Sequence, residues 1–512
     1  MRAAPRRAWA GRVVALGAGA ACAFAARGAA AYDARVDASL DAQFYSFRSP
    51  YGDPIVLRRR YTSTLGLELE RLEGEGVERD GPRIAFRSRL RVDADFGIAA
   101  DELDRESTGY VPGLQQAPLD LMYAYLDAQR LLGGAVGLRL GRQYLVDALG
   151  FWSFDGALLR FTPPVPFELS GFAGFEQRTG LPMLATPRFA AQGVQRGNRD
   201  GLELTEHPSY LDDSELAPAF GAALETAQLS AFHARLSYRK VLSRSRVLVS
   251  PFLDELGGVA SVAGLRTSTE RAALSARLDL PELGALSAEA VYDAYVGLVS
   301  EAAVALDWYT SAALTLGADV EYDLPTYDGD SIFNWFTHRG ATTAQARVSY
   351  APSRAFDAAL SGGARVYETE GDPDDFARPI DAAPAPRATA RSADAIGRLG
   401  ARYRFHDHSL GFDAQAQIGQ RGHLAGADVT LRRRYSGGRY DSLVLVSVYD
   451  WSDELRASRD ATSLTYVLGL GMTPGLGFAG DGRLGVEWEH TLNRLVAQRF
   501  RLLITLEFSV LR

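Results

Sequence analysis

Hydrophobic and polar residues alternate along most of this chain. In residues 84–98, IAFRSRLRVDADFGI, every second position from Arg87 to Asp95 is charged, and mostly apolar residues stand between them. The same period of two returns in residues 34–44 near the start and 500–510 near the end. Successive side chains of a β-strand point to opposite faces, so this period indicates strands. The pattern therefore predicts an all-β protein.

About 22 such segments follow the first 31 residues, and most have the length of a tilted strand that crosses a bilayer. The connections between them alternate between short turns, such as 131–133 and 406–407, and long loops. Outer-membrane barrels show this alternation, with short periplasmic turns and long outer loops. We expect residues 32–512 to form one transmembrane, antiparallel, up-and-down β-barrel of about 22 strands (about 18 to 24). The long outer loops are expected near residues 99–118, 178–216, 241–271, 323–340 and 368–392.

The charged positions determine which face of each strand meets lipid. An arginine on the lipid side of a barrel costs roughly 2–4 kcal/mol at the membrane midplane. Three arginines of residues 83–98 facing lipid would therefore cost about 6–12 kcal/mol, more than the stability of many domains. We expect Leu90 and Val92, with Phe86 and Phe96, to face lipid and the charged residues to face an aqueous lumen. A soluble β-sandwich also alternates, but about 480 residues would normally divide into several sandwich domains.

The first 31 residues are expected to be a cleaved signal peptide. Four arginines (Arg2, Arg6, Arg7 and Arg12) precede the apolar stretch VVALGAGAACAFAA, and Ala29-Ala30-Ala31 provides a small-residue cleavage site. The first strand then starts directly after this site, so no N-terminal plug is expected. Export through this route predicts a location in the cell outer membrane.

Composition removes several classes of function. Cys22, in the signal, is the only cysteine, so the mature chain has no thiol for disulfides, catalysis or metal binding. The whole chain carries 55 Lys and Arg and 63 Asp and Glu, and five of the arginines lie in the signal. The mature net charge is therefore 50 minus 63, or −13, which disfavours nucleic acid as a partner.

Neither a catalytic nor a metal site is expected. The seven histidines are scattered and have no partnered motif of the Ser–His kind. His406-Asp407-His408 is the one tight cluster with metal-ligand character, but it falls at a predicted turn, where a solvated polar turn is the simpler interpretation. Acidic loops near residues 328–330 and 372–375 have no complete calcium-loop pattern. We therefore predict no enzymatic activity and no cofactor.

The predicted lumen carries the main functional signal, because rings of charge sort permeating solutes by sign. The alternative is that paired charges only keep the wall hydrated and in register. The lumen-lining candidates are Arg87, Arg89, Arg91, Asp93, Asp95, Arg235, Arg402, Arg404, Arg432, Arg434, Glu487, Glu489, Arg499, Arg501 and Glu507.

About 22 strands enclose a lumen too wide to be filled by side chains alone. Without a plug, we expect an outer loop, either 178–216 or 323–340, to fold inward and narrow it. The second of these loops contains the candidate constriction residues Asp328, Asp330, Phe333, Trp335 and Phe336. The three aromatic residues fit equally well in the aromatic girdle at the membrane interface.

Three local phrases carry a resemblance to Gram-negative outer-membrane barrels of the porin-like class. Residues 138–161, LRLGRQYLVDALGFWSFDGALLRF, are similar to the GRQ…DG hairpin of several outer-membrane porin and export-channel families. Residues 324–336 and 448–471 are similar to parts of other outer-membrane proteins. The last residues, FRLLITLEFSVLR, resemble the terminal strand signal that the barrel-assembly machinery reads, although they end in Leu511-Arg512 instead of an aromatic residue.

This resemblance implies a channel for passive diffusion of small hydrophilic solutes, set in outer-membrane lipid and lipopolysaccharide. It also implies the barrel-assembly machinery as a partner during biogenesis. One alternative is an export channel for a polysaccharide or other polymer, for which a lumen of one charge sign is expected. The other alternative is a structural or adhesive surface barrel with a closed lumen, which would conduct no ions. The sequence names no particular solute and leaves the oligomeric state open.

Overall fold

The computed structural model describes residues 33–48, 54–74, 81–95, 119–177, 217–227, 229–243, 247–249, 259–261, 265–326, 340–370, 389–419, 422–453, 460–473, 475–476, 480–493 and 497–511. Strands account for nearly all of them, and the described helical structure is a single 3-10 turn, η7 (Ser436–Gly438). Among these residues, no helix combines the length and the apolar character that crossing a membrane requires.

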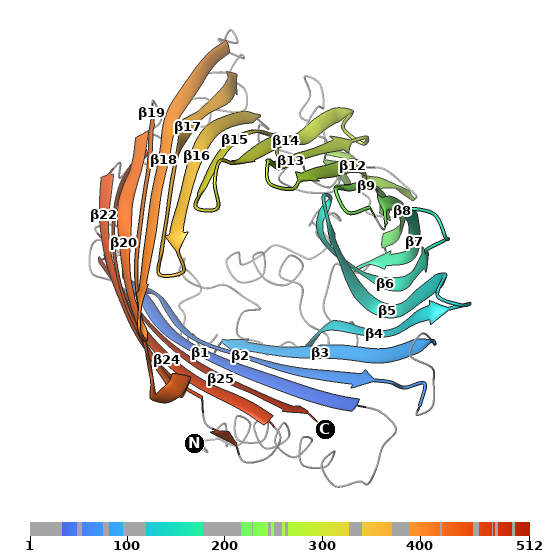
Figure 1. Ribbon diagram of the computed structural model, residues 1–512, viewed down its shortest axis with the longest axis horizontal. Helices are drawn as coiled ribbons and strands as arrows, with labels where there is room; N and C mark the ends of the chain where they lie inside the picture. The colour runs from blue at the N-terminus through green and yellow to red at the C-terminus, as the bar shows by residue number, and fades with distance from the viewer. Residues whose placement is uncertain are drawn as a thin grey trace.

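Twenty-two long strands form one antiparallel ring, which Figure 1 shows from its open end. Three short strands are additional: β10 (Val247–Val249) and β11 (Val259–Ser261) pair with each other, and β23 (Gly475–Leu476) pairs with β24. The ring confirms the predicted fold class and strand number. Its strands are β1 (Asp33–Arg48), β2 (Pro54–Glu70), β3 (Arg83–Asp95), β4 (Leu119–Leu131), β5 (Val136–Asp147), β6 (Gly150–Phe161), β7 (Phe167–Glu176), β8 (Ala217–Thr226), β9 (Phe232–Ser243), β12 (Arg266–Leu280), β13 (Gly284–Asp293), β14 (Leu298–Tyr309), β15 (Leu314–Asp323), β16 (Ala341–Ser353), β17 (Phe356–Glu370), β18 (Thr389–Phe405), β19 (His408–Gly419), β20 (Gly422–Tyr435), β21 (Tyr440–Asp453), β22 (Asp460–Met472), β24 (Gly480–Asn493) and β25 (Ala497–Leu511).

The first and last strands close the ring. β1 pairs with β25 from Arg35 opposite Leu511 to Ser46 opposite Phe500. Closure satisfies the backbone hydrogen bonds of both strands, which an open sheet edge could not do inside a bilayer. The wall strands have 10 to 17 residues, enough to cross the hydrocarbon layer at a tilt.

Direct cross-strand pairs share a face, so the strand register identifies the inner face of the whole ring. Arg235, Ser275, Glu289 and Ala303 are successive partners on β9, β12, β13 and β14, and all four line the same cavity. The strand register can be followed in the same way from β14 through β15 to β22, β24, β25, β1 and β2 to β3. It places Arg91 of β3 on the same face as these four residues. We call this the inner face, and the space that it encloses the lumen.

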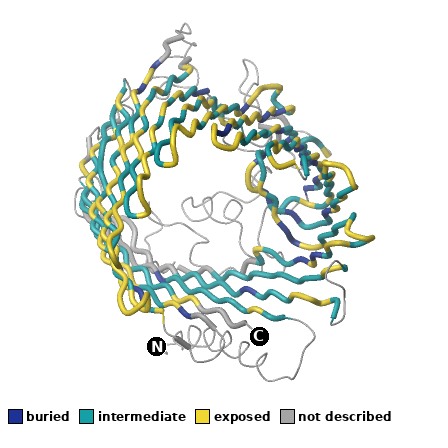
Figure 2. Tube along the Cα trace, in the orientation of Figure 1, coloured by how far each residue is buried: buried dark blue, intermediate teal, exposed yellow. Residues whose placement is uncertain are grey.

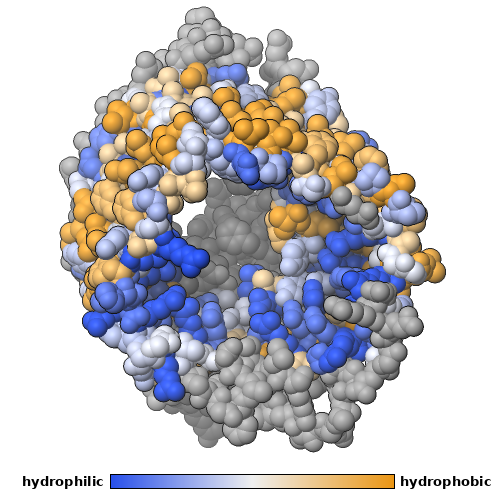
Figure 3. Space-filling model, in the orientation of Figure 1, coloured by the Kyte–Doolittle hydropathy of each residue, from blue (hydrophilic) through white to orange (hydrophobic). Residues whose placement is uncertain are grey.

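The opposite face is apolar. Leu236, Leu274, Leu286, Val304 and Val320 alternate with the inner residues on five strands, and each is 42–52% exposed. In Figure 3, hydrophobic residues extend around much of the outside of the ring, while hydrophilic residues line the lower part of the lumen wall. Exposed apolar side chains in this number suit a hydrocarbon environment.

The strands extend further than the sequence pattern predicts. β9 ends at Ser243 and β12 begins at Arg266, so the predicted loop 241–271 loses residues at both ends and also contains the β10–β11 hairpin. β17 and β18 similarly take residues 368–370 and 389–392 from the predicted loop 368–392. The sequence pattern lost these ends because their alternation is weak, whereas backbone pairing continues wherever the neighbouring strand is present.

Candidate functional site

The hairpin made by β5 and β6 separates from the wall of the barrel. Pairing between β4 and β5 extends only to Ala124 opposite Arg142, and pairing between β6 and β7 only to Phe154 opposite Glu176. Residues 143–153, which we call the hairpin tip, continue beyond both points. The strand pairing of these residues lies within the β5–β6 hairpin, and at its base the Ser153 carbonyl oxygen still accepts a hydrogen bond from Gln177 N at 2.9 Å, directly after β7. Beyond that bond the tip is unpaired with β4 and β7, so it can bend away from the ring.

The tip bends into the lumen. Leu149 packs against Ala273 of β12 and Val291 of β13, although β7, β8 and β9 separate β6 from these strands around the ring. The backbone carbonyl of Leu149 accepts a hydrogen bond from Arg239 Nη2 at 2.8 Å. Asp147 lies 3.6 Å from Arg235. Figure 1 shows the hairpin inside the ring, alongside β8 and β9 and directed toward β12. The hairpin thus narrows the lumen.

Apolar residues hold the hairpin against the inner wall. Trp152 and Phe154 stack with ring centroids 4.6 Å apart, and Phe154 is fully buried. They pack, with Leu158, on Ala217 and Ala219 of β8 and on Val241 of β9. Small alanine side chains leave room for the two large rings, which is the complementarity that close packing requires. Figure 2 shows buried residues in this part of the ring. This side of the lumen is therefore packed with apolar groups, whereas the sequence predicted a wet interior throughout.

Three glycines permit the bend. Gly141, Gly156 and Gly174 are direct partners on β5, β6 and β7, and all three point inward. A Cβ atom at Gly156 would lie 2.3 Å from the carbonyl oxygen of Ala173, and one at Gly174 would lie 2.2 Å from that of Asp155. Real Cβ atoms do not approach backbone this closely, so the neighbouring strands fold toward each other only because the Cβ atoms are missing.

We expect Gly156→Ala to lower the free energy of unfolding by about 1–3 kcal/mol, because the new methyl group forces the backbone of β6 and β7 apart. Gly171→Ala on β7 is the matched control, since its Cβ would meet nothing closer than 3.8 Å. The control should change stability by about 0.5 kcal/mol or less. Denaturant titration of the barrel in phospholipid vesicles measures both values, and equal effects would contradict the role of the glycine row.

The outer side of the bend carries an ion pair. Arg142 Nε and Nη2 donate to the two carboxylate oxygens of Asp155 at 2.7 and 2.8 Å. Arg142 Nη1 also donates to the carbonyl oxygen of Leu121 at 3.1 Å, next to the point where β4 leaves β5. Next to them, Gln143 is fully buried, and its Nε2 donates to the carbonyl oxygen of Gly156 at 3.1 Å. The GRQ and DG residues of the sequence therefore form the bend itself.

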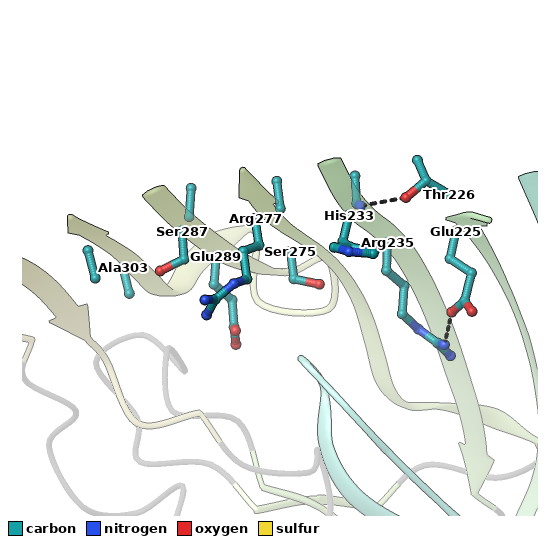
Figure 4. Close-up of a pocket in the computed structure, with 13 residues that line it drawn as sticks. Glu225, Thr226, His233, Arg235, Ser275, Arg277, Ser287, Glu289 and Ala303 are labelled. Carbon is teal, nitrogen blue, oxygen red and sulfur yellow. Dashed lines mark hydrogen bonds and ion pairs between the residues drawn. The ribbon is translucent and has the colours of Figure 1, made fainter. Parts of the chain in front are cut away.

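Two cavities lie on the inner face beside the hairpin. The chamber, of about 210 Å³, lies between the hairpin and the wall from β7 to β9. The groove, of about 410 Å³, runs over β9, β12, β13 and β14, and Figure 4 shows Arg235, Arg277 and Glu289 projecting into it. Glu225 and Arg235 form an ion pair and line both cavities. The two spaces therefore meet at this pair.

Most lumen-lining candidates lie on other parts of the wall, and several form ion pairs. Arg87 contacts Glu70 at 3.2 Å, and Arg89 contacts Asp37. Arg404 contacts Asp357 at 2.7 Å, and Arg501 contacts Glu489 at 3.2 Å. The remaining described candidates on the inner face by register are Arg91, Arg402, Arg432, Arg434, Glu487 and Glu507. Their part in permeation stays a prediction.

Some candidate residues lie outside the described residues. The side chains of Asp93, Asp95 and Arg499 are among them, although their backbone belongs to β3 and β25. The proposed constriction residues Asp328, Asp330, Phe333, Trp335 and Phe336 are outside them as well, as is loop 178–216. The described edge of loop 323–340 is attached to the inner wall, since Arg271 Nη2 donates to the Thr326 carbonyl oxygen at 3.0 Å.

The sequence indicated a hairpin at residues 138–161 but did not predict that its tip bends inward or that a chamber lies beside it. The alternation predicts a strand that begins at Phe154, whereas β6 begins at Gly150 and includes Phe151 and Trp152. The available signal was the aromatic run FWSF next to the GRQ phrase, but alternation reports only which face a residue occupies. It does not show that two strands leave the wall together.

Of the described residues, no three histidines, cysteines or carboxylates gather closely enough to bind a metal ion. His406 lies in the two-residue turn between β18 and β19, and the ring of His408, the first residue of β19, stacks on Phe405 with centroids 4.9 Å apart. This geometry makes His408 part of a packed strand end.

No protein-family model and no curated protein matches the chain. Similar solved structures include OccAB4 from Acinetobacter baumannii, with 8% identity, a TM-score of 0.41, and coverage of 94% of this chain and 98% of that chain. The outer membrane protein OpdK from Pseudomonas aeruginosa has 9% identity, a TM-score of 0.39, and coverage of 94% and 99%. OccD3 from Pseudomonas aeruginosa has 8% identity, a TM-score of 0.40, and coverage of 93% and 91%. At such identities the likeness concerns fold only, and this chain's own strand pairing establishes its closed 22-strand antiparallel barrel.

Proposed function

We propose that this protein is an outer-membrane channel through which small hydrophilic solutes diffuse passively, and that the inward β5–β6 hairpin narrows the path. The observation that carries the proposal is the division of the closed ring into an apolar outer face and a charged inner face with two cavities. Such a ring is stable in hydrocarbon and leaves polar groups for solutes inside. Contact with lipopolysaccharide and delivery by the barrel-assembly machinery are parts of the same proposal.

The charge distribution favours small solutes over an exported polymer. Arginines and carboxylates alternate around the inner face and neutralise each other in pairs, as in Arg347 with Asp307 at 2.7 Å and Arg271 with Asp293 at 3.1 Å. An export channel for a charged polymer is expected to present one sign of charge along its path. The mixed lining supplies hydrogen bonds without holding one charge sign strongly.

A thiol-labelling experiment in planar bilayers tests the channel. Ser287→Cys places a thiol in the groove, and Cys22 is the chain's only other cysteine. We expect single channels of this variant to lose current in steps when a charged, membrane-impermeant thiol reagent is added, because the adduct occupies the ion path. Leu286→Cys, one residue along β13 on the apolar face and 42% exposed, is the matched control and should keep its current.

Two results would contradict the proposal. A correctly folded barrel that conducts no ions, judged folded by heat-modifiable mobility on a gel, would instead support the structural or adhesive alternative. Current loss in Leu286→Cys but not in Ser287→Cys would reverse the assignment of the two faces.

A further inference from the structure

The chamber contains two charged side chains without an ion pair. The Arg160 side chain of β6 forms no ion pair or hydrogen bond with any residue that the structure describes, and it lines the chamber. Glu168 of β7 also lines it and accepts one hydrogen bond, from Thr162 Oγ1 at 3.1 Å. Ser170, opposite Arg160 in the register, is the next inward residue after Glu168. A cation and an anion therefore face the same small space from neighbouring strands.

The other charged groups of the chamber are engaged. Arg235 pairs with Glu225 and with Asp147. Arg239 donates to the Leu149 carbonyl oxygen, and its guanidinium carbon lies 5.3 Å from the centre of the Trp152 ring. These contacts hold the hairpin in the lumen. Among the described lining residues, Arg160 and Glu168 thus remain available to a solute.

The rest of the lining includes an apolar surface. Leu145, Leu158 and Phe172 contribute to the chamber. The Phe172 ring is fixed by Phe154, with centroids 5.2 Å apart, and by Gly221, where a Cβ would lie 2.5 Å from the ring. The Phe172 ring and the two leucines thus provide a rigid apolar patch beside the two charged side chains.

We propose that the chamber binds a small zwitterion with an apolar side chain, namely a free α-amino acid, on its way through the channel. The carboxylate would pair with Arg160, the ammonium group with Glu168, and the side chain would contact Phe172 and the leucines. The proposal rests on the proposed channel function for its place on a transport path. It names the class of solute that the path accepts.

The physical reason is mutual neutralisation. A guanidinium and a carboxylate in a confined space are costly without partners, and a solute that carries both complementary charges satisfies them together. An anion alone would leave Glu168 unsatisfied and would be repelled by it, and a cation alone would do the same at Arg160. The volume, about 210 Å³, is smaller than the roughly 300–1,000 Å³ of pockets for drug-sized ligands, so a single small solute fits.

Two measurements on the full-length barrel test this proposal, with L-phenylalanine as the probe. In single-channel recordings, phenylalanine should interrupt the current in brief, concentration-dependent blocks. Phenylalaninamide, which lacks the carboxylate charge, and N-acetylphenylalanine, which lacks the ammonium charge, should each block about tenfold more weakly, since each loses one charge-assisted contact. Isothermal titration calorimetry of the barrel in detergent measures the same affinities without requiring conduction.

Variants assign the charges. In Arg160→Gln, phenylalanine should lose its advantage over phenylalaninamide, and in Glu168→Gln its advantage over N-acetylphenylalanine. Arg398→Gln is the matched control: Arg398 is on the inner face of β18, 68% exposed and 3.6 Å from Asp413, and far around the ring from the chamber. It should leave all three affinities unchanged.

The outcomes separate the two proposals. Two results would overturn the zwitterion site and leave the channel intact. In the first, the barrel conducts ions and binds the three probes with equal affinity. In the second, the barrel conducts ions and Arg398→Gln weakens phenylalanine binding as much as Arg160→Gln does. Phenylalanine binding by calorimetry in a barrel that conducts no ions overturns the channel and keeps the site. Heat-modifiable mobility shows whether each variant is folded, and the second charge variant decides if the first does not fold.

Discussion

A barrel in which residues 144–153 are replaced by Asn-Gly is expected to conduct severalfold more than the native protein. These residues are most of the hairpin tip, whose strand pairing lies within the hairpin and which extends along the inner wall to Ala273 and Val291. Gln143 and Phe154 are direct partners, so a two-residue turn can join them without disturbing the wall. With the tip absent, the path past β12 and β13 loses its obstruction. Single-channel conductance in planar bilayers gives the result.

The turn between β13 and β14 provides the control for this deletion. Residues 294–297 connect two wall strands that remain paired to their ends, and Asn-Gly can replace them as well. This replacement should leave the conductance unchanged, because the turn lies at the rim of the wall. Equal conductance in the tip-shortened and native barrels would show that the hairpin does not limit the path.

Asp155→Ala is expected to lower the free energy of unfolding by about 2–3 kcal/mol, less than the roughly 3–5 kcal/mol for a fully buried ion pair, because the Asp155 side chain is 44% exposed. The Arg142 side chain is only 7% exposed and loses both of its bonds to the carboxylate. The pair lies on the face of the hairpin that also carries Leu140 and Leu159, which are 43% and 51% exposed. A guanidinium left alone there keeps its cost of desolvation without compensation. Denaturant titration in phospholipid vesicles measures the loss.

Two controls make this result specific. The double variant Arg142→Met with Asp155→Leu removes both charges and should regain most of the lost stability, apart from the bond to the Leu121 carbonyl oxygen. Asp413→Ala breaks the exposed pair with Arg398, whose side chains are 68% and 52% exposed, and should cost less than about 1 kcal/mol. A cost for Asp155→Ala as small as that for Asp413→Ala would mean that water solvates Arg142 at the bend.

The fold was predictable because a strand reports its two environments directly in its sequence. Arg87 and Arg89 alternate with Ser88 and Leu90, and the register places the two arginines on the inner face with the residues that line the cavities. Burying charges in hydrocarbon is too costly to occur repeatedly, so the alternation had one stable solution. The strand ends were less predictable: β9 and β12 both extend into the predicted loop 241–271, because backbone pairing does not depend on alternation there.

The site was predictable only in part. Alternation assigned Arg235 to the inner face, and the register agrees. It did not identify Arg160 and Glu168 as neighbours without ion pairs, because this depends on which other charges reach Glu225 and Asp147. The GRQ and DG residues marked the hairpin, but only coordinates show that Gly141 and Gly156 are direct partners and that the sheet bends at them.

The sequence by itself determined the closed sheet, an approximate number of strands and the two faces of each strand, since these follow from local alternation and from the cost of charge in lipid. The tertiary structure alone decided that residues 143–153 leave the wall, pack Trp152 and Phe154 on β8 and β9, and form a chamber beside them. The physical reason is the range of the interactions. The alternation of polar and apolar residues is set by the environment of each strand face and can be read from neighbouring residues. The bend depends on contacts between strands that are distant in the sequence, and no local pattern encodes these contacts.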